Sequence, residues 1–546
     1  MSLNIDVHCH TSSKPFMSGI GGQKLNMFDS TTFNLEHPIY RLLKKPLEKF
    51  SHINLSTQSN FDRLYEGGVR VAFVSMTPME KAFTVLNPDA KGFKSQLIKT
   101  FMREVSNYRN GFLSSLAMNA LTGYKASDID AVKNTAYDIY NYMLKAEFKL
   151  LSSLKNKKSP NGKYTVKFPN SYTELSTNLL DETILNVLVT VEGAHAFGSA
   201  AVLKNIQEGR KNNHRTETHN VALATPLCTN IKDIRTQFDI PIFSVGLCHH
   251  FWNGLGGHAR SLASLLEMVV NQDEGLNAPL LDTGKVVIDE FNVTDYDGKK
   301  VSKIVVDIKH MSPQCRKDYY AYKKSKPSLK NNPIFCSHTG ISMSFETLDE
   351  WIKYVDLNPL EKTGKKYEDG NYYLHEQSIN LCREDLIEAY HSKGLIGIQL
   401  DEKRIMGPLA LNELSLRSKA GGGSEQKYVY AKAIWANIFC AVDELEKGNV
   451  PDLKKAWDLF CIGSDFDGLI NHLDSFESAA KMNDLKSTMS YFLQEPEDII
   501  LFFKDKNTQY TLNIQDIERL KNGFTNQELT DKIFYKNALQ FLERNF

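Results

Sequence analysis

The sequence predicts an α/β fold in which eight parallel strands close into a (β/α)8 TIM barrel with large, mainly helical insertions. Eight short, nearly continuous apolar runs alternate with helical patterns, as expected for parallel strands that are buried on both faces. Five of these runs end abruptly in His, Glu or Asp, and barrels of this type carry their reactive groups at the carboxyl ends of the strands. The expected strands are 4–8, 69–76, 186–192, 241–248, 303–310, 333–338, 395–400 and 459–465.

The segments between the strands vary in length, and the whole chain, 1–546, is predicted to be one elaborated barrel domain. Residues 91–157 are strongly helical and contain no proline, so we expect an inserted helical layer there. The polar ranges 272–302 and 341–378 are expected to be loop insertions, and a helix is expected over 259–270.

Composition excludes several classes of protein. The 65 basic and 65 acidic residues give a net charge of zero, which offers no electrostatic case for nucleic acid or an anionic membrane surface. The eight cysteines form no CxxC pair and are expected to be reduced thiols. There is no apolar run of 18 residues and no signal-peptide pattern at the N-terminus, so a cytoplasmic protein is expected. A homo-oligomer is left open.

The polar residues that end the apolar runs form a candidate metal site. His8 and His10 are two apart on a strand, so both imidazoles point to the same side and can share one metal. Taken alone, a histidine at a strand end is usually a hydrogen-bonded surface residue, but six such groups in this order favour metal binding. The groups expected to converge are His8, His10, Glu192, His310, His338 and Asp465.

This set of nitrogen and oxygen donors suits zinc, although manganese or cobalt could also fit. Glu192 can bridge two metals because a carboxylate has two oxygens. Two metals about 3.5–4 Å apart can share a water, lower its pKa and polarise a carbonyl group. Asp465 is then expected to take a proton from that water and pass it to a leaving amine.

The order of these motifs resembles the amidohydrolase superfamily, and within it the membrane (renal) dipeptidase family, peptidase family M19. The matching stretches are VTVEGAHAF at 189–197, VVDIKHMSP at 305–313, PIFCSHTG at 333–340, IGSDFDG at 462–468 and the closing segment 522–542.

The resemblance implies a binuclear zinc TIM barrel of the metal-dependent hydrolase type that cleaves a dipeptide or a similar small amide. It implies that one metal is held by His8, His10 and Glu192, and the other by Glu192, His310 and His338. In that comparison Glu192 bridges the two metals.

The resemblance also assigns roles around the metals. Asp465 takes the place of the general acid/base, and His249 takes the place of a histidine that steadies the tetrahedral intermediate. The neighbouring His250 and Asn253 are candidates for substrate binding, whereas His195 and His258 are interpreted as structural residues or as residues that support the site from behind its ligands.

Two departures from the family pattern concern charge. The family's first motif is usually His-x-Asp, whereas His10 stands at the third position here, so the site is less negative. The family also grips the substrate carboxylate with an arginine in an Arg-Arg-Asn stretch, and the aligned residues 377–380 of this chain read Gln-Ser-Ile-Asn. Arg404 or Arg260 could replace that arginine, because a guanidinium binds a carboxylate through two hydrogen bonds.

Two other functions remain open from the sequence. The opening Asp6 to Thr11 also resembles the polymerase-and-histidinol-phosphatase (PHP) phosphoesterases, but those barrels close with a histidine where this chain has Asp467. A catalytically silent barrel that serves as a binding module is the other alternative, and the complete set of ligand residues argues against it.

Overall fold

The computed structural model describes most of the chain. The described residues are 3–19, 26–36, 38–48 with gaps, 53–84, 119–133 without 121, 137–199, 202–203, 221–262, 270–358, 371–503 and 509–546.

Eight parallel strands form the barrel, as predicted. They follow one another in the order β1-β2-β4-β5-β8-β9-β10-β11, and β3 (Thr165–Lys167) extends the sheet beside β4. All eight expected runs are confirmed as strands. Their bounds are β1 Asn4–Cys9, β2 Val69–Met76, β4 Ile184–Val191, β5 Ile242–Gly246, β8 Val305–Asp307, β9 Phe335–Thr339, β10 Leu395–Ile398 and β11 Phe460–Ile462.

Hydrogen bonds between β1 and the segment that follows β11 close the barrel. The backbone N–H of Asp465 donates to His8 at 2.9 Å, and that of His10 donates to Phe466 at 2.8 Å. The buried carboxylate of Asp6 accepts from both the backbone N–H and the hydroxyl of Ser464, at 2.9 and 2.5 Å. These hydrogen bonds therefore join the first and last strands of the barrel near their carboxyl ends.

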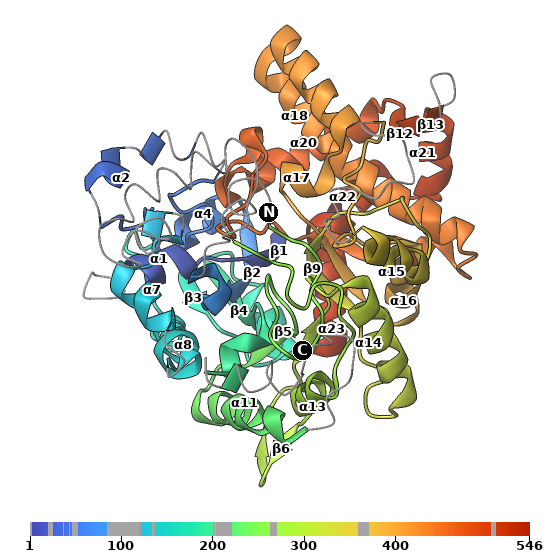
Figure 1. Cartoon of the computed structure of the whole chain (residues 1–546). Helices are drawn as coiled ribbons and strands as arrows, with labels where there is room; N and C mark the ends of the chain where they lie inside the picture. Colours follow the sequence, from blue (N-terminus) through green and yellow to red (C-terminus); the bar gives the residue numbers. More distant parts are fainter. Residues whose placement is uncertain are drawn as a thin grey trace.

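Helices surround the barrel (Figure 1). Aromatic and aliphatic side chains from inside the barrel, among them Phe243 and Phe335, pack against Phe541 of the C-terminal helix. The helices are α1 Ser13–Gly19, α2 Pro38–Leu42, α4 Phe61–Glu66, α7 Ala126–Lys133, α8 Lys145–Ser152, α9 Tyr172–Asn178, α11 Thr225–Gln237, α13 Asp282–Phe291, α14 Pro313–Ser325, α15 Leu348–Leu357, α16 Arg383–His391, α17 Glu402–Ile405, α18 Pro408–Lys447, α19 Leu453–Ala456, α20 Met482–Gln494, α21 Ile514–Lys521, α22 Asn526–Asp531 and α23 Asn537–Asn545.

The remaining strands lie outside the barrel. A small hairpin joins β6 (Asp295–Tyr296) to β7 (Lys299–Lys300), and a second one joins β12 (Ile499–Phe503) to β13 (Gln509–Leu512). The long α18, orange in Figure 1, changes direction at Gly422, whose φ of 68° and ψ of −145° are not helical.

The segments between strands differ in part from expectation. Residues 91–118 and 359–370 lie outside the described part, but 126–133 and 139–152 are helical, as expected for the inserted layer. The ranges expected to be loops contain α13 and α15, because both stretches carry an apolar helical face that polar turns flank.

The helix expected over 259–270 does not begin at Ala259. The backbone N–H groups of Ser261 and Leu262 instead donate to the side chain of Gln272, at 3.2 and 2.9 Å, and residues 259–262 are not helical. Residues 263–269 lie outside the described part.

Two composition-based expectations can be compared with the structure. The eight cysteines are all free thiols, as predicted. Within the described ranges, every helix is too short or too polar to cross a membrane.

Candidate metal centre and active site

The six side chains predicted to converge lie together at the carboxyl ends of the barrel strands, and Glu192 is at their centre. All of them are buried. The histidine nitrogens nearest to the Glu192 carboxylate are Nε2 of His310 at 2.9 Å, His10 at 3.3 Å, His249 at 3.5 Å, His338 at 3.6 Å and His8 at 3.8 Å.

His8 and His10 point to the same side of β1, as their spacing predicts, and their Nε2 atoms are 3.1 Å apart. Nδ1 of His10 lies 3.0 Å from the carbonyl oxygen of Ser75, which can only accept a hydrogen bond. We therefore assign the ring proton of neutral His10 to Nδ1, which leaves the Nε2 lone pair facing the cluster. A metal-binding histidine needs this arrangement.

The charges of the cluster suit a cation. Burial lowers the pKa of His10, but hydrogen bonds to Asp465 and Glu192 outweigh it and raise the pKa to about 10. Burial lowers the pKa of His310 to about 3, although Glu192 opposes that shift, and lowers the pKa of His338 well below its usual range. When no ion is bound, His10 therefore carries the extra proton. His310 and His338 stay neutral, so their free nitrogens can act as metal ligands.

Asp465 is turned into the site by an unusual backbone conformation. Its φ is 59°, and the φ of His310 is 67°, a left-handed region that is uncommon for non-glycine residues and is found in turns and at functional sites. Oδ1 of Asp465 lies 3.2 Å from Nε2 of His10, and Oδ2 accepts a hydrogen bond from Gln399 at 2.7 Å. A Cβ on Gly468 would lie 2.0 Å from Oδ1, so this position requires glycine.

The donor atoms have the spacing that a metal requires. Two ligand atoms about 2.1 Å from one tetrahedral zinc lie about 3.4 Å apart. In each of three groups of side chains, all the donor atoms lie within 4.8 Å of one another. The first group is His8, His10 and Glu192, the second is Glu192, His249 and His310, and the third is His8, His338 and Asp465.

These groups agree only in part with the sets implied by the resemblance. The first group is the implied one, and Glu192 belongs to two groups, as a bridging carboxylate would. The second group contains His249 in place of His338, while His338 is grouped with Asp465. His249 therefore lies within the ligand cluster itself. The role implied by the resemblance, steadying the tetrahedral intermediate, did not require it to lie so close to the metal ligands.

Glu80 is a member of the site that the sequence did not reveal. Its buried carboxylate forms an ion pair with Nδ1 of His249 at 2.7 Å and accepts the backbone N–H groups of His250 and Phe251, both at 3.1 Å. The His195 ring lies parallel to the ring of His249, with 6.2 Å between ring centroids. No strand ends at Glu80, so the pattern that found the other residues could not find it.

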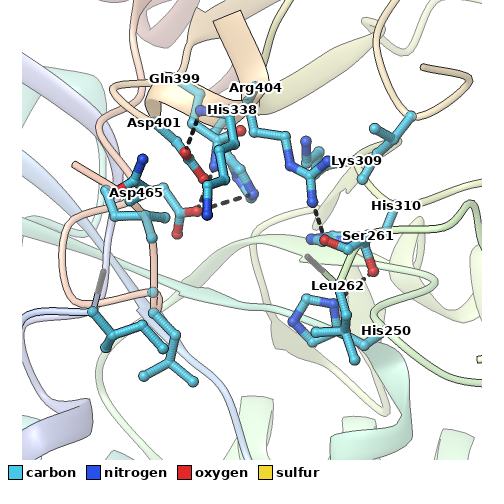
Figure 2. A pocket seen from close by; sticks show the side chains of 17 residues that line it. His250, Ser261, Leu262, Lys309, His310, His338, Gln399, Asp401, Arg404 and Asp465 are labelled. Carbon is cyan, nitrogen blue, oxygen red and sulfur yellow. Dashed lines mark hydrogen bonds and ion pairs between the residues drawn. The ribbon is translucent and has the colours of Figure 1, made fainter. Parts of the chain in front are cut away.

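A pocket beside the cluster is lined by three cationic side chains, Lys309, Lys403 and Arg404, and by the carboxylates of Asp401 and Asp465 (Figure 2). Arg404 donates to the side chain of Gln377 at 2.8 Å and to the backbone carbonyl of Ser261. Lys309 lines the same pocket, is 3% exposed, and has no hydrogen-bond partner for its ammonium group among the described residues. Burial, together with Arg404, lowers the pKa of Lys309 to about 8.

The other candidate residues are placed as follows. His250 lines the pocket, and its Nδ1 lies 2.7 Å from the Ser261 hydroxyl. Asn253 lies outside the cluster, because its side chain bonds the backbone of Leu247 and Leu255. Arg260 pairs with Asp273 at 2.9 Å.

Asp467, which follows the site in sequence, is a structural residue. Its carboxylate pairs with the buried ammonium of Lys14 at 2.6 Å and accepts from the backbone of Gln58 and Ser59, at 2.8 and 2.9 Å. It therefore ties the loop after β11 to the loop that precedes α4.

No protein-family model and no curated protein matches the sequence. Among solved structures, the chain is similar to M19 dipeptidase-like metallopeptidases. One is a metallo peptidase from Rhodobacter sphaeroides liganded with a phosphinate mimic of the dipeptide L-Ala-D-Ala (12% identity, 100% of this chain and 99% of that one, TM-score 0.43). A second is the dipeptidase AC of family M19 (13%, 93% and 96%, TM-score 0.43), and a third is the probable dipeptidase PvdM from Pseudomonas aeruginosa (12%, 89% and 88%, TM-score 0.39). These identities are too low to transfer the role of any residue.

Proposed function

We propose that the protein is a binuclear metal-dependent hydrolase that cleaves an amide bond in a dipeptide or a similar small molecule. The observation that carries the proposal is the cluster of buried His, Glu and Asp side chains in which one carboxylate, Glu192, is shared by two groups of donors. The order of the sequence motifs supports the same class of reaction.

The residues present fit two divalent ions, zinc by preference. His8, His10 and Glu192 would hold one ion, and Glu192, His310 and His338 would hold the other, which leaves His249 free for another role. Bound there, such ions lower the pKa of a shared water and polarise the substrate carbonyl.

The chain's own groups then manage the protons. Asp465 accepts a proton from the attacking water and returns it to the leaving amine, and the hydrogen bond from Gln399 holds its carboxylate in place. His249, held by Glu80, offers Nε2 toward the position where negative charge develops on the carbonyl oxygen.

The competing phosphoesterase function draws no support from the site. That class places a histidine near the end of the barrel where Asp467 stands, and the contacts of Asp467 with Lys14 and Ser59 are structural.

The test is hydrolysis by zinc-loaded protein of dipeptides, N-acyl amino acids and a phosphomonoester, with metal content measured on the same samples. Wild type is expected to release amine from the amides. Asp465→Asn should keep its metal and lose turnover by at least about a hundredfold. Near-full activity of that variant, or cleavage of the phosphomonoester alone, contradicts the proposal.

A further inference from the structure

The inserted helical layer contacts the metal site directly. The buried carboxylate of Glu147 on α8 accepts a hydrogen bond from the hydroxyl of Ser12 at 2.6 Å, and Ser12 lies two residues beyond the candidate ligand His10. In Figure 1, α7 and α8 lie on the same side of the barrel as α1, which begins at Ser13. The insertion therefore packs against the segment that follows the first pair of candidate ligands.

A tight loop of the insertion carries Tyr124. The side-chain amide of Asn119 donates to the backbone carbonyl of Tyr124 at 2.6 Å, which closes the loop. Gly123 within the loop has a φ of 76°, and a Cβ there would lie 2.2 Å from the ring of Phe33. The loop therefore needs glycine at this position in order to pack closely on Phe33, and the side chain of Tyr124, which follows, is buried.

Tyr124 lines a cavity that we call the apolar pocket. Three residues of the metal-ligand cluster, His10, Glu192 and His249, also line it. Such a pocket gains free energy by covering a short hydrocarbon group, because its other walls are mainly hydrophobic. These walls include Met17, Phe33, Met79, Phe83 and Leu469.

The position of Asp465 indicates which part of a substrate this pocket receives. Asp465 lines the neighbouring pocket of Figure 2 and is not among the residues that line the apolar pocket. In the proposed reaction, the leaving nitrogen must lie within hydrogen-bond reach of the group that returns its proton. The leaving amine is therefore on the side of Asp465, and the acyl part is on the side of Tyr124.

Two hydroxyl groups in the apolar pocket have no acceptor for their protons. Tyr124 is 1% exposed and Ser13 is 3% exposed, and neither hydroxyl donates a hydrogen bond to any described residue. Leaving a buried hydroxyl unpaired costs free energy, and buried polar groups in folded proteins are nearly always paired. A bound molecule with a neutral hydrogen-bonding group would satisfy these two hydroxyls.

The carboxylates that line the apolar pocket, among the residues described, are already engaged. Asp467 pairs with the ammonium of Lys14 at 2.6 Å and accepts the hydroxyl of Ser59 at 2.7 Å. Glu192 is the carboxylate shared by two groups of candidate metal ligands. An ammonium group in this pocket would therefore lose its water without gaining a counter-ion, which is costly.

We propose that Tyr124 and Ser13 bind a neutral hydroxyl group on the acyl part of the substrate. This inference rests on the proposed function and narrows its substrate class. The substrates are amides whose acyl part is short, largely apolar and hydroxyl-bearing, in preference to free dipeptides with an ammonium group at that place. The two side-chain hydroxyls supply the hydrogen bonds that the substrate hydroxyl needs, and the helical insertion provides one of them.

The experiment compares four amides that share alanine as the leaving group, using zinc-loaded wild type at pH 7. The acyl parts are L-lactoyl, 3-hydroxypropionyl, propionyl and L-alanyl, and the amino group of the last is mostly charged at this pH. We expect kcat/KM for the better hydroxyacyl amide to exceed that for propionyl by about 3- to 10-fold, the range for one neutral hydrogen bond. We expect it to exceed that for alanyl by at least about tenfold.

Variants then assign the preference to the two hydroxyls. Tyr124→Phe and Ser13→Ala each remove only an oxygen, so each should lower the ratio of hydroxyacyl to propionyl turnover. The double variant should bring that ratio close to one while propionyl turnover stays within about threefold of wild type. Tyr319→Phe is the matched control, because Tyr319 is a buried tyrosine on α14 that lines neither pocket. Metal content is measured in every sample, so that a loss of metal is not mistaken for a loss of specificity.

The outcomes separate this inference from the proposed function. If propionyl is cleaved as fast as both hydroxyacyl amides, or if alanyl is cleaved fastest, the assignment of the apolar pocket is wrong while amide hydrolysis stands. A double variant that keeps the full preference would likewise exclude Tyr124 and Ser13. If none of these amides and none of the wider panel is cleaved, the proposed function itself fails.

Discussion

Glu80 and His249 form a buried ion pair, with 2.7 Å between Oε1 and Nδ1, although they come from loops 169 residues apart in the chain. The pair fixes the imidazole ring so that Nε2 lies 3.5 Å from the Glu192 carboxylate. Burial lowers the pKa of His249, but the charges of Glu192 and Glu80 outweigh it and raise the pKa above its usual value. Glu80 thus acts on the cluster through His249 as a positioning residue.

The first prediction concerns this pair. Glu80→Gln keeps the shape of the side chain but removes its charge, so the ring of His249 loses its orientation and part of its tendency to hold a proton. Loss of such an outer partner costs about 10- to 100-fold in activity or metal affinity. We expect kcat to fall by this amount with KM little changed, measured with the best amide substrate. Glu444→Gln, a buried ion-paired glutamate on α18, is the control. An unchanged kcat for Glu80→Gln would remove Glu80 from the site.

The second prediction tests the glycine that makes room for Asp465. In Gly468→Ala the new methyl group would meet Oδ1 of Asp465 at 2.0 Å, so the carboxylate must move. A displacement of about 1 Å in a catalytic group costs about a hundredfold in rate. We expect that loss in kcat while the protein stays folded. Gly423→Ala is the control, because a Cβ there meets nothing within 4 Å. Full activity of Gly468→Ala would show that Asp465 need not hold its position.

The third prediction concerns metal content. His310 lies 2.9 Å from Glu192, and its low pKa keeps it neutral. His310→Ala removes one donor, and we expect the metal bound per chain, measured by elemental analysis, to fall from about two to about one. His391→Ala, at the end of α16 and exposed, is the control. Retention of two metals in His310→Ala would exclude it as a ligand.

Much of the fold could be predicted from the sequence because the information is local. Each barrel strand is an apolar run with a polar end, and the parallel barrel brings those ends to one edge without further information. His8, Glu192 and Asp465 are therefore found together, as expected. The prediction also named His249, but it could not show that this ring lies within a group of ligand atoms.

The contributions of loops could not be predicted in the same way. Glu80 follows a strand end by four residues, and its role depends on where the chain folds back to meet His249. Asp467 stands in the same motif as Asp465, yet it pairs with Lys14, which is 453 positions away in sequence. Lys309 precedes a predicted ligand, and only the burial of its unbonded ammonium group distinguishes it from a surface lysine.

The last prediction links stability to pH through Glu376, a buried carboxylate that accepts hydrogen bonds from Ser342 and Ser344. Burial raises its pKa from 4.5 to about 7, although those hydrogen bonds oppose the shift. Between pH 4.5 and 7 the folded protein therefore holds a proton that the unfolded chain has lost. Because the folded state binds more protons in this window, its stability falls as the pH rises through it, by up to about 3 kcal/mol for this group.

Glu376→Gln mimics the protonated side chain at every pH and removes this contribution. The variant is therefore expected to gain stability relative to wild type as the pH is raised from 5 to 8, with most of the gain complete near pH 7. Urea unfolding of both proteins at several pH values measures the difference, and all other titrating groups cancel because both proteins contain them. A difference that stays constant across this range would mean that Glu376 is ionised in the folded protein well below pH 7.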